Sequence, residues 1–233
     1  MLDLTNEKVL LFSDTHLTCK FDKKQFQALK EIIEQADRVI VNGDFWEYIA
    51  CDFEKFIKSE WAEKLFPLLK KKKTIFLHGN HDAKRFMSWN GINKFADKRE
   101  KDIEFKSADK KFFIEHGDLV ALEFDVDHKT ISEFVQIHLP TLYLWLTDLE
   151  YGKGFLSKIF KKIMIKRRKI DLEQMKKFSL RNKETGHLRI FGHVHMKKHN
   201  FDDGFAVIGE FKNGVKNCIF IENGKVEFFS GKY

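Results

Sequence analysis

Residues 74–82 read Thr-Ile-Phe-Leu-His-Gly-Asn-His-Asp, a short apolar run that ends abruptly in glycine and metal-binding side chains. Such a run is typical of a buried strand that ends at a polar corner. Four further runs end in the same way. They are residues 8–12 before Ser-Asp-Thr-His, 38–41 before Asn-Gly-Asp, 111–114 before Glu-His-Gly-Asp, and 188–191 before Gly-His-Val-His.

The segments between the first three runs have apolar residues at helical spacing: Phe26, Leu29, Ile32 and Ile33, and then Phe56, Trp61, Leu65 and Leu68. A repeat of strand, polar corner and helix is typical of an α/β fold. Towards the end of the chain, Asn213-Gly214 and Asn223-Gly224 are turn dipeptides that predict β-hairpins in residues 201–233. The length of 233 residues suits a single domain spanning residues 1–233.

Residues 126–181 depart from this rhythm, because they show helical spacing and no strand pattern. In residues 155–168 the apolar side chains form one predicted helix face and the basic side chains the other. The apolar residues are Phe155, Leu156, Ile159, Phe160, Ile163 and Met164, and the basic ones are Lys158, Lys161, Lys162, Lys166 and Arg167. We predict a helical insertion or lid within the domain.

The formal net charge is +7, which favours anionic partners such as nucleic acid, acidic phospholipid or a phosphorylated substrate. A lysine-rich solvated surface explains the same total equally well, so charge alone leaves the alternatives open.

Three cysteines, Cys19, Cys51 and Cys218, are widely separated, which argues against a disulfide framework and suits a reducing compartment. The N-terminal residues do not resemble a signal peptide. The apolar stretch 138–149 is too short to cross a bilayer and contains Asp148. We therefore expect a cytoplasmic protein that at most lies on a membrane surface.

The residues that bind metals gather in the predicted polar corners. In an open α/β sheet, ligands bind beyond the carboxyl ends of the strands, where the loops converge. Six of the ten histidines lie in these corners, which histidine used only for packing does not explain. The candidate metal ligands are Asp14, His16, Asp44, Asn80, His116, His193 and His195.

The types of these residues suit two divalent ions. The pairs Asp14-x-His16 and His193-x-His195 place two side chains on one side, because side chains of an extended chain alternate. The carboxylate of Asp44 has two oxygens and is able to bridge two ions. Two divalent ions and two ligand carboxylates leave about two positive charges, which attract a phosphate and lower the pKa of a bound water.

These motifs, in this order, resemble the signature of the calcineurin-like metallophosphoesterase family. That signature comprises Asp-x-His, Gly-Asp, Gly-Asn-His-Asp, a histidine and Gly-His-x-His, found here at Asp14-Thr-His16, Gly43-Asp44, Gly79-Asn80-His81-Asp82, His116 and Gly192-His193-Val-His195. The resemblance implies an α/β sandwich of two mixed β-sheets flanked by helices. It also implies a metal-dependent phosphoesterase that usually holds manganese.

The resemblance further implies a role for each site residue. One ion would be held by Asp14, His16, Asp44 and His195, and the other by Asp44, Asn80, His116 and His193, with Asp44 bridging. His81 would lie near the leaving-group oxygen and protonate it or stabilise its charge. Asp82 would orient His81.

Gly43-Asp44-Phe45-Trp46-Glu47-Tyr48, His116-Gly117-Asp118 and the helical insertion resemble the branch that contains UDP-2,3-diacylglucosamine hydrolases. Those enzymes act in lipid A synthesis at the inner membrane, and the products of this reaction would be UMP and a lipid monosaccharide phosphate. A basic amphipathic helix suits such a substrate, by lining an acyl-chain chamber or by lying on an anionic membrane. Lys166 and Arg167 are the candidate substrate contacts. These hydrolases typically carry arginine at the position of His81.

Two alternatives remain. A soluble phosphodiesterase or nuclease would use the basic face of residues 155–169 to bind phosphate backbones. A non-catalytic scaffold of the same fold would require altered metal ligands, and all the ligand positions are intact. No sequence feature indicates an obligate protein partner.

Overall fold

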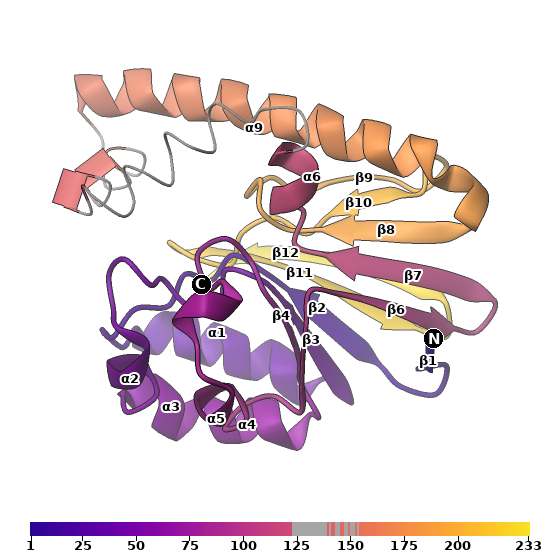
Figure 1. Cartoon of the computed structure of the whole chain (residues 1–233), viewed down its shortest axis with the longest axis horizontal. Coiled ribbons are helices and arrows are strands. Elements are labelled where there is room, and N and C mark those ends of the chain that lie inside the picture. The colour runs from indigo at the N-terminus through magenta and orange to yellow at the C-terminus, as the bar shows by residue number, and fades with distance from the viewer. Residues whose placement is uncertain (123–138, 140, 143–144, 147–148, 150–151, 153) are drawn as a thin grey trace.

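The computed structural model describes residues 1–122, 139, 141–142, 145–146, 149, 152 and 154–233. The described residues form four layers, with two β-sheets packed face to face and helices on both outer sides (Figure 1). This arrangement confirms the predicted α/β sandwich of two mixed sheets flanked by helices.

The first sheet has the strand order β12-β11-β2-β3-β4-β5. Its strands β2 to β5 are parallel, whereas β11 is antiparallel to both of its neighbours. The bounds are β2 Val9–Phe12, β3 Arg38–Asn42, β4 Ile75–Leu77, β5 Lys98–Glu100, β11 Val215–Glu222 and β12 Lys225–Lys232.

The second sheet has the order β1-β6-β7-β8-β10-β9 and mixes parallel with antiparallel pairs. Its bounds are β1 Leu2–Asp3, β6 Asp102–Ser107, β7 Lys110–Glu115, β8 His187–Phe191, β9 Lys198–Asn200 and β10 Phe205–Val207. All five strands predicted from the apolar runs are therefore present, in one sheet or the other.

Side chains point alternately to the two faces of each strand, which explains why the core has three parts, one between the sheets and one on the outer side of each sheet. In β2 the side chains of Val9 and Leu11 face the second sheet, while Leu10 and Phe12 face the helices. All four are fully buried, which accounts for the continuous apolar run of a central strand. Residues of β6, β7, β8 and β10 supply the second sheet's share of the central layer.

Short helices cover the outer face of the first sheet. The side chain of Asp22 caps α1 by accepting from the backbone N–H groups of Lys24 and Gln25. The predicted helical segment around Trp61 forms three short helices, and Pro67 lies in the first turn of the last of them. The helices are α1 Lys23–Glu34, α2 Phe53–Phe56, α3 Glu60–Lys64, α4 Phe66–Lys71, η1 Lys84–Phe86 and α5 Trp89–Ile92.

The outer face of the second sheet is covered by α6 (Asp118–Leu122) and by the long helix α9 (Phe155–Arg181), which η2 (Lys183–Thr185) follows (Figure 1). Met175 of α9 is fully buried against α6 and the second sheet. The second half of the predicted insertion is therefore helical. Most of residues 126–153 lie outside the described residues, and so does half of the apolar stretch 138–149.

One of the two predicted hairpin turns joins paired strands. Asn223-Gly224 connects β11 to β12, and both residues have positive φ, as a two-residue hairpin turn requires. Asn213-Gly214 is also a turn with positive φ, but β10 before it and β11 after it belong to different sheets. The prediction of a hairpin there was wrong, because the chain uses this turn to pass between sheets.

The cysteine expectation also needs correction. Cys19 and Cys51 form a disulfide, while Cys218 is a buried free thiol. Cys19 follows β2 and Cys51 follows β3, and these two strands pair in parallel. The loops beyond their carboxyl ends therefore run side by side and bring the two sulfurs together, a proximity that spacing along the chain did not reveal. Among the described residues, no helix is both long and apolar enough to cross a membrane.

Candidate metal centre

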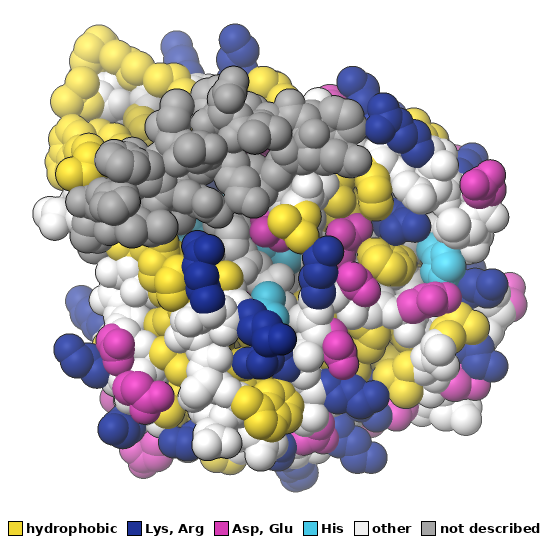
Figure 2. All heavy atoms as spheres, viewed as in Figure 1, with side chains coloured by type: hydrophobic (Ala, Val, Ile, Leu, Met, Phe, Trp, Pro, Cys, Tyr) yellow, Lys and Arg dark blue, Asp and Glu magenta, His cyan; other side chains and the backbone are white. Residues whose placement is uncertain are grey.

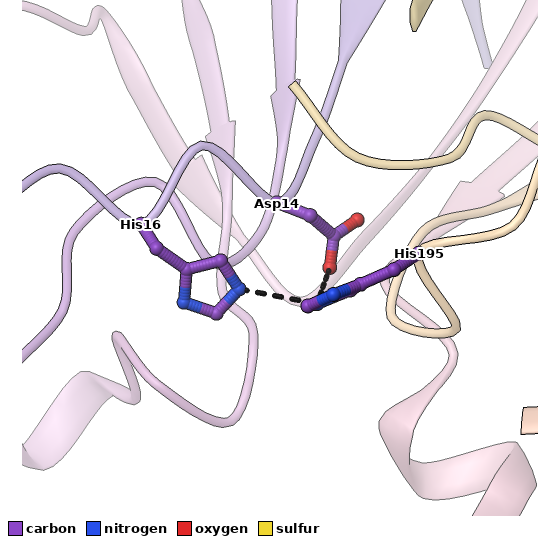
Figure 3. A group of neighbouring side chains, drawn as sticks. All are labelled: Asp14, His16 and His195. Atoms are coloured by element: carbon purple, nitrogen blue, oxygen red, sulfur yellow. Dashed lines mark hydrogen bonds and ion pairs between the residues drawn. The ribbon is translucent and has the colours of Figure 1, made fainter. Parts of the chain in front are cut away.

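The candidate ligands meet where the strands of both sheets end. Asp14 and His16 follow β2, Asp44 follows β3, and His116 follows β7, while Asn80 follows β4 and the 193–195 pair follows β8. Figure 3 shows the side chains of Asp14, His16 and His195 converging from the loops after β2 and β8. Residues up to 181 positions apart in the sequence therefore share one site.

The backbone of these loops is unusual. Five of the seven candidate ligands have positive φ, a conformation that is uncommon for residues other than glycine. Such conformations persist only where the surrounding structure enforces them, and they concentrate at functional sites. The five are Asp14 (54°), His16 (44°), Asp44 (50°), His193 (67°) and His195 (54°).

Two glycines are required by the crowding around the ligands. A Cβ atom on Gly43 would clash with the imidazole of His116, and one on Gly79 would clash with the carboxylate of Asp44. Gly43 also has a φ of 76°. The ligand loops therefore approach one another more closely than side-chain-bearing residues allow.

One cluster consists of Asp14, His16 and His195. Nε2 of His195 lies 3.3 Å from Oδ1 of Asp14 and 3.2 Å from Nε2 of His16. The other oxygen of Asp14 accepts hydrogen bonds from the Ser13 hydroxyl at 2.6 Å and from the backbone N–H of His193 at 3.1 Å. Asp14 is thereby held so that Oδ1 faces the two imidazoles.

A second cluster consists of Asp44, His116 and His193. Oδ2 of Asp44 lies 3.3 Å from Nε2 of His116 and 3.7 Å from Nε2 of His16, between the two clusters. Its other oxygen accepts from the backbone N–H of His81 at 2.9 Å. Nδ1 of His193 lies 3.0 Å from Oδ1 of Asn80, so Asn80 joins this cluster. Asp44 is therefore the residue that both clusters share.

Most of these imidazoles have a lowered pKa, which keeps them neutral and able to bind a metal ion. Burial lowers the pKa of His16, of His195 and of His193, the last to about 3, with further lowering from neighbouring cations. Neutral imidazoles have a lone pair to donate to a metal ion. Burial alone would lower the pKa of His116, but the Asp44 carboxylate raises it well above the usual value, and a cation in the cluster would take the place of that proton.

Two buried atoms test whether the clusters fit metal ions. Oδ1 of Asp14 and Nε2 of His116 are buried and accept or donate no hydrogen bond within the described structure. Nδ1 of His116 donates to the carbonyl oxygen of Asn42 at 2.8 Å, which leaves Nε2 as the ligating atom. Buried polar atoms without partners are costly, and one ion bound in each cluster would remove the cost. The donor set therefore fits divalent metal ions.

His81 lies beside the two clusters and forms a group with His16 and Asp44. Its Nδ1 lies 2.9 Å from Oε1 of Glu47, and Nδ1 of His16 lies 2.9 Å from Oε2 of the same carboxylate. Burial lowers the pKa of His81, but Glu47 and Asp44 outweigh this and raise it to about 9. Glu47 was not among the residues predicted from the sequence.

The carboxylate of Asp82 contacts the backbone. Its two oxygens accept from the N–H groups of Gly79 at 2.7 Å and of Phe45 at 2.6 Å, which ties the loop after β4 to the loop after β3. Burial and the Asp44 charge raise its pKa to about 7. The family resemblance implied that Asp82 orients His81. In the structure, the carboxylate of Glu47 contacts the His81 ring.

Cations also reach the site. Arg168 of α9 donates to Nδ1 of His195 at 2.8 Å, and Oε2 of Glu210 lies 3.5 Å from the same nitrogen. The charge of Lys212 lowers the pKa of His16 and of His195. The predicted substrate contacts Lys166 and Arg167 are exposed on α9, two positions and one position before Arg168. Figure 2 shows histidine atoms in a hollow of this face with Lys and Arg side chains beside them.

A cavity of about 440 Å³ adjoins the second cluster. His116 and Gly79 form the wall that it shares with the metal ligands. Its other lining residues include the cations Lys84, Arg99 and Lys101 and the acids Glu100, Glu115 and Asp118. Burial raises the pKa of Glu115 to about 7. The cavity offers room for a substrate group beside the clusters.

Comparison with known families identifies the chain. Residues 7–197 match the family model described as calcineurin-like phosphoesterase. The chain belongs to the calcineurin-like phosphoesterase family. The match covers every candidate ligand, and the protein is accordingly a metal-dependent phosphoesterase, as predicted. No curated protein shows significant sequence similarity to it.

Several solved structures are similar to this calcineurin-like phosphoesterase over nearly all of both chains. They include an archaeal phosphodiesterase (17% identity, 97% of this chain and 99% of that one, TM-score 0.46) and a protein of Thermus thermophilus (13%, 98% and 99%, 0.46). A conserved Streptococcus pneumoniae protein described as a predicted phosphoesterase is also similar (12%, 97% and 98%, 0.39).

Proposed function

We propose that the protein hydrolyses a phosphodiester or diphosphate bond with two divalent ions, which we take to be Mn²⁺. The observation that carries the proposal is the position of Asp44 Oδ2 between two ligand clusters. The first ion would be held by Asp14, His16, Asp44 and His195, and the second by Asp44, Asn80, His116 and His193. Four imidazoles together with carboxylate and amide oxygens suit first-row divalent ions.

The ions, when bound, would polarise phosphoryl oxygens and lower the pKa of a water molecule. The residues of the chain supply the remaining functions. The His81 ring contacts Glu47 through Nδ1, and a protonated ring would donate from Nε2 to the leaving-group oxygen. Arg168 and Lys212 contribute positive charge for the substrate phosphate.

The substrate that we propose is a lipid-nucleotide diphosphate, UDP-2,3-diacylglucosamine, cleaved to UMP and a lipid monosaccharide phosphate. Support comes from the first half of α9, which exposes a series of large apolar side chains instead of packing them on the core. Acyl chains or the surface of an anionic inner membrane would cover such residues favourably. They are Phe155 (77% exposed), Leu156 (58%), Ile159 (43%) and Ile163 (57%).

A second candidate is a soluble phosphodiesterase or nuclease. The cavity beside His116 favours it, because Lys84, Arg99 and Lys101 line a space that would admit a second phosphate or a nucleoside without any acyl chain. The presence of histidine at position 81, where the UDP-2,3-diacylglucosamine hydrolases typically have arginine, is also compatible with this activity.

The test is to offer Mn²⁺-loaded protein three substrates: UDP-2,3-diacylglucosamine, a chromogenic phosphodiester and single-stranded oligonucleotides. We expect UMP release from the first at a rate far above the other two. A complete absence of UMP, together with cleavage of the diester or the oligonucleotides, would reject the lipid substrate and favour the second candidate.

A pair of variants makes the test specific to α9. Phe155→Ser removes the most exposed apolar side chain of α9, and Phe229→Ser removes an exposed phenylalanine of β12 as a matched control. We expect the first variant to slow UMP release and to leave hydrolysis of the chromogenic diester unchanged. Equal rates for both variants on the lipid substrate would show that α9 does not bind acyl chains.

A further inference from the structure

We infer that Glu47 is a positioning residue that fixes the ring orientation of His16 and His81 together by accepting a hydrogen bond from Nδ1 of each. One carboxylate would thereby couple a metal ligand to the imidazole that faces the leaving group. The inference rests on the proposed function, and it assigns to Glu47 a role that neither the signature motifs nor the sequence pattern predicted.

The contacts of Glu47 show that Nδ1 of each ring carries a proton. Its Oε2 lies 2.9 Å from Nδ1 of His16, while Nδ1 of His81 lies 2.8 Å from Oε2 and 2.9 Å from Oε1. An ionised carboxylate only accepts hydrogen bonds, so each Nδ1 must carry a proton and donate it. In His16 this leaves the lone pair on Nε2, the atom that lies 3.2 Å from Nε2 of His195 in the first cluster.

The two rings are arranged around the shared carboxylate. The ring centroids of His16 and His81 lie 4.6 Å apart, with the ring planes at 82° to one another. A rotation of either ring breaks its contact with Glu47. If the carboxylate followed one ring, it would lose its contact with the other, so the shared carboxylate resists movement of both rings.

The backbone holds Glu47 in place. Its N–H donates to the carbonyl oxygen of Leu17 at 2.9 Å, and the N–H of Leu17 donates to the carbonyl oxygen of Phe45 at 2.9 Å. The loop that carries His16 thus runs alongside the loop that carries Glu47 as a continuation of the parallel β2–β3 pairing. Phe45 and Trp46 before it are buried in the core. Glu47 itself is 8% exposed, so little water competes for its oxygens.

The substitution Glu47→Gln separates the two functions of the carboxylate. A glutamine side chain has nearly the same shape, but it offers one accepting oxygen and one donating NH₂ group. Nδ1 of His81 contacts both oxygen positions and Nδ1 of His16 contacts one of them, so in either orientation of the amide the NH₂ group faces at least one Nδ1. Two donors form no hydrogen bond, so that Nδ1 must give up its proton or its ring must turn away.

The first measurement needs no bound metal and no activity. In protein labelled with ¹⁵N at histidine, long-range ¹H–¹⁵N correlations show which ring nitrogens carry protons, and His16→Gln and His81→Gln variants assign the signals. We expect Nδ1 of both rings to be protonated in the native protein, and at least one Nδ1 to lose its proton or its hydrogen bond in Glu47→Gln. The matched control is Glu104→Gln, since Glu104 contacts Nε2 of His187 at 2.7 Å, at the opposite end of β8 from the metal clusters. It should alter the signals of His187 alone.

The second measurement uses leaving groups. Loss of a group that orients a ligand typically costs about 10- to 100-fold in metal affinity or activity. We expect Glu47→Gln to weaken Mn²⁺ binding and lower kcat to this extent, with a larger loss in kcat for a diester that has an alkyl alcohol as leaving group than for one that releases nitrophenolate. A poorly acidic alcohol depends more on protonation by His81.

If Nδ1 of both rings kept its proton and its hydrogen bond in Glu47→Gln, the inference would be overturned. Equal losses for both leaving groups would overturn the part that concerns His81. If the native protein hydrolysed no phosphoester at all, the proposed function would fail, whereas the NMR result would still decide whether Glu47 sets the two rings.

Discussion

A guanidinium nitrogen of Arg168 lies 2.8 Å from Nδ1 of His195. Since a guanidinium only donates, His195 accepts at Nδ1 and carries its own ring proton on Nε2, the atom that faces Asp14 at 3.3 Å. Ligation of a metal ion through Nε2 requires that proton on Nδ1 instead, where Oε2 of Glu210 lies 3.5 Å away. Arg168 and a metal ion therefore compete for one imidazole.

The substitution Arg168→Ala should separate metal binding from activity. Binding of a metal ion would break the contact between the guanidinium and His195, and we expect the guanidinium to contact the substrate phosphate instead. A hydrogen bond to a charged group contributes about 1.5–3 kcal/mol, so kcat/KM for a phosphodiester should fall about 10- to 100-fold. The affinity for Mn²⁺ measured by calorimetry should equal or exceed that of the native protein.

The control for this prediction is Lys177→Ala. Lys177 is exposed on α9, so its loss changes the net charge equally without removing the contact between Arg168 and His195. We expect little change in kcat/KM. An equal loss in both variants would show that α9 acts through its overall charge, and weaker metal binding in Arg168→Ala would contradict the competition.

His81→Gln should abolish most of the activity and spare the metal ions. His81 lies outside the proposed ligand sets, and a group that donates a proton in the transition state contributes about 10²- to 10⁴-fold. We therefore expect kcat to fall by that factor while two ions per chain remain bound, as counted by elemental analysis. The matched control is His199→Gln, an exposed histidine of β9. Loss of an ion from His81→Gln would make His81 a ligand.

Asp44→Asn and Asp14→Asn should differ in how many ions they lose. Oδ2 of Asp44 lies between the two clusters, whereas Asp14 belongs to one of them. We expect Asp44→Asn to weaken the binding of both ions and Asp14→Asn to weaken one. Chelation should abolish hydrolysis by the native protein and added Mn²⁺ should restore it. If both variants kept the same single ion, Asp44 would not bridge.

The positions of the candidate metal ligands were predictable because each follows a short apolar run that is typical of a buried strand. Once Val9–Phe12 and Ile75–Leu77 are strands, Asp14 and Asn80 must lie beyond their carboxyl ends. The sheet order and the positive φ of His16 were not predictable, because neither leaves a pattern in the local sequence. Both depend on which loops come together.

The contacts of Glu47 and Arg168 could not be predicted from the sequence, for related reasons. Glu47 reaches His16 only through the pairing of two loops that are separate in the sequence. On α9, the predicted polar face made Lys166 and Arg167 the candidate substrate contacts. The face that packs inward is set by Met175, and Arg168 lies two helical turns before it on the same side. Only the contact with the second sheet reveals which face that is.

The disulfide gives a prediction that needs no assay of function. Cys218 is buried and burial raises its pKa to about 12, so the native protein should react negligibly with a thiol reagent at neutral pH. Unfolding in denaturant without reductant should expose one thiol per chain, and reduction should then expose all three cysteines. A disulfide typically contributes about 2–4 kcal/mol, mainly by restricting the unfolded chain. Cys51→Ser should therefore lower the free energy of unfolding by that amount, whereas three reactive thiols before reduction would show that the Cys19–Cys51 bond does not form.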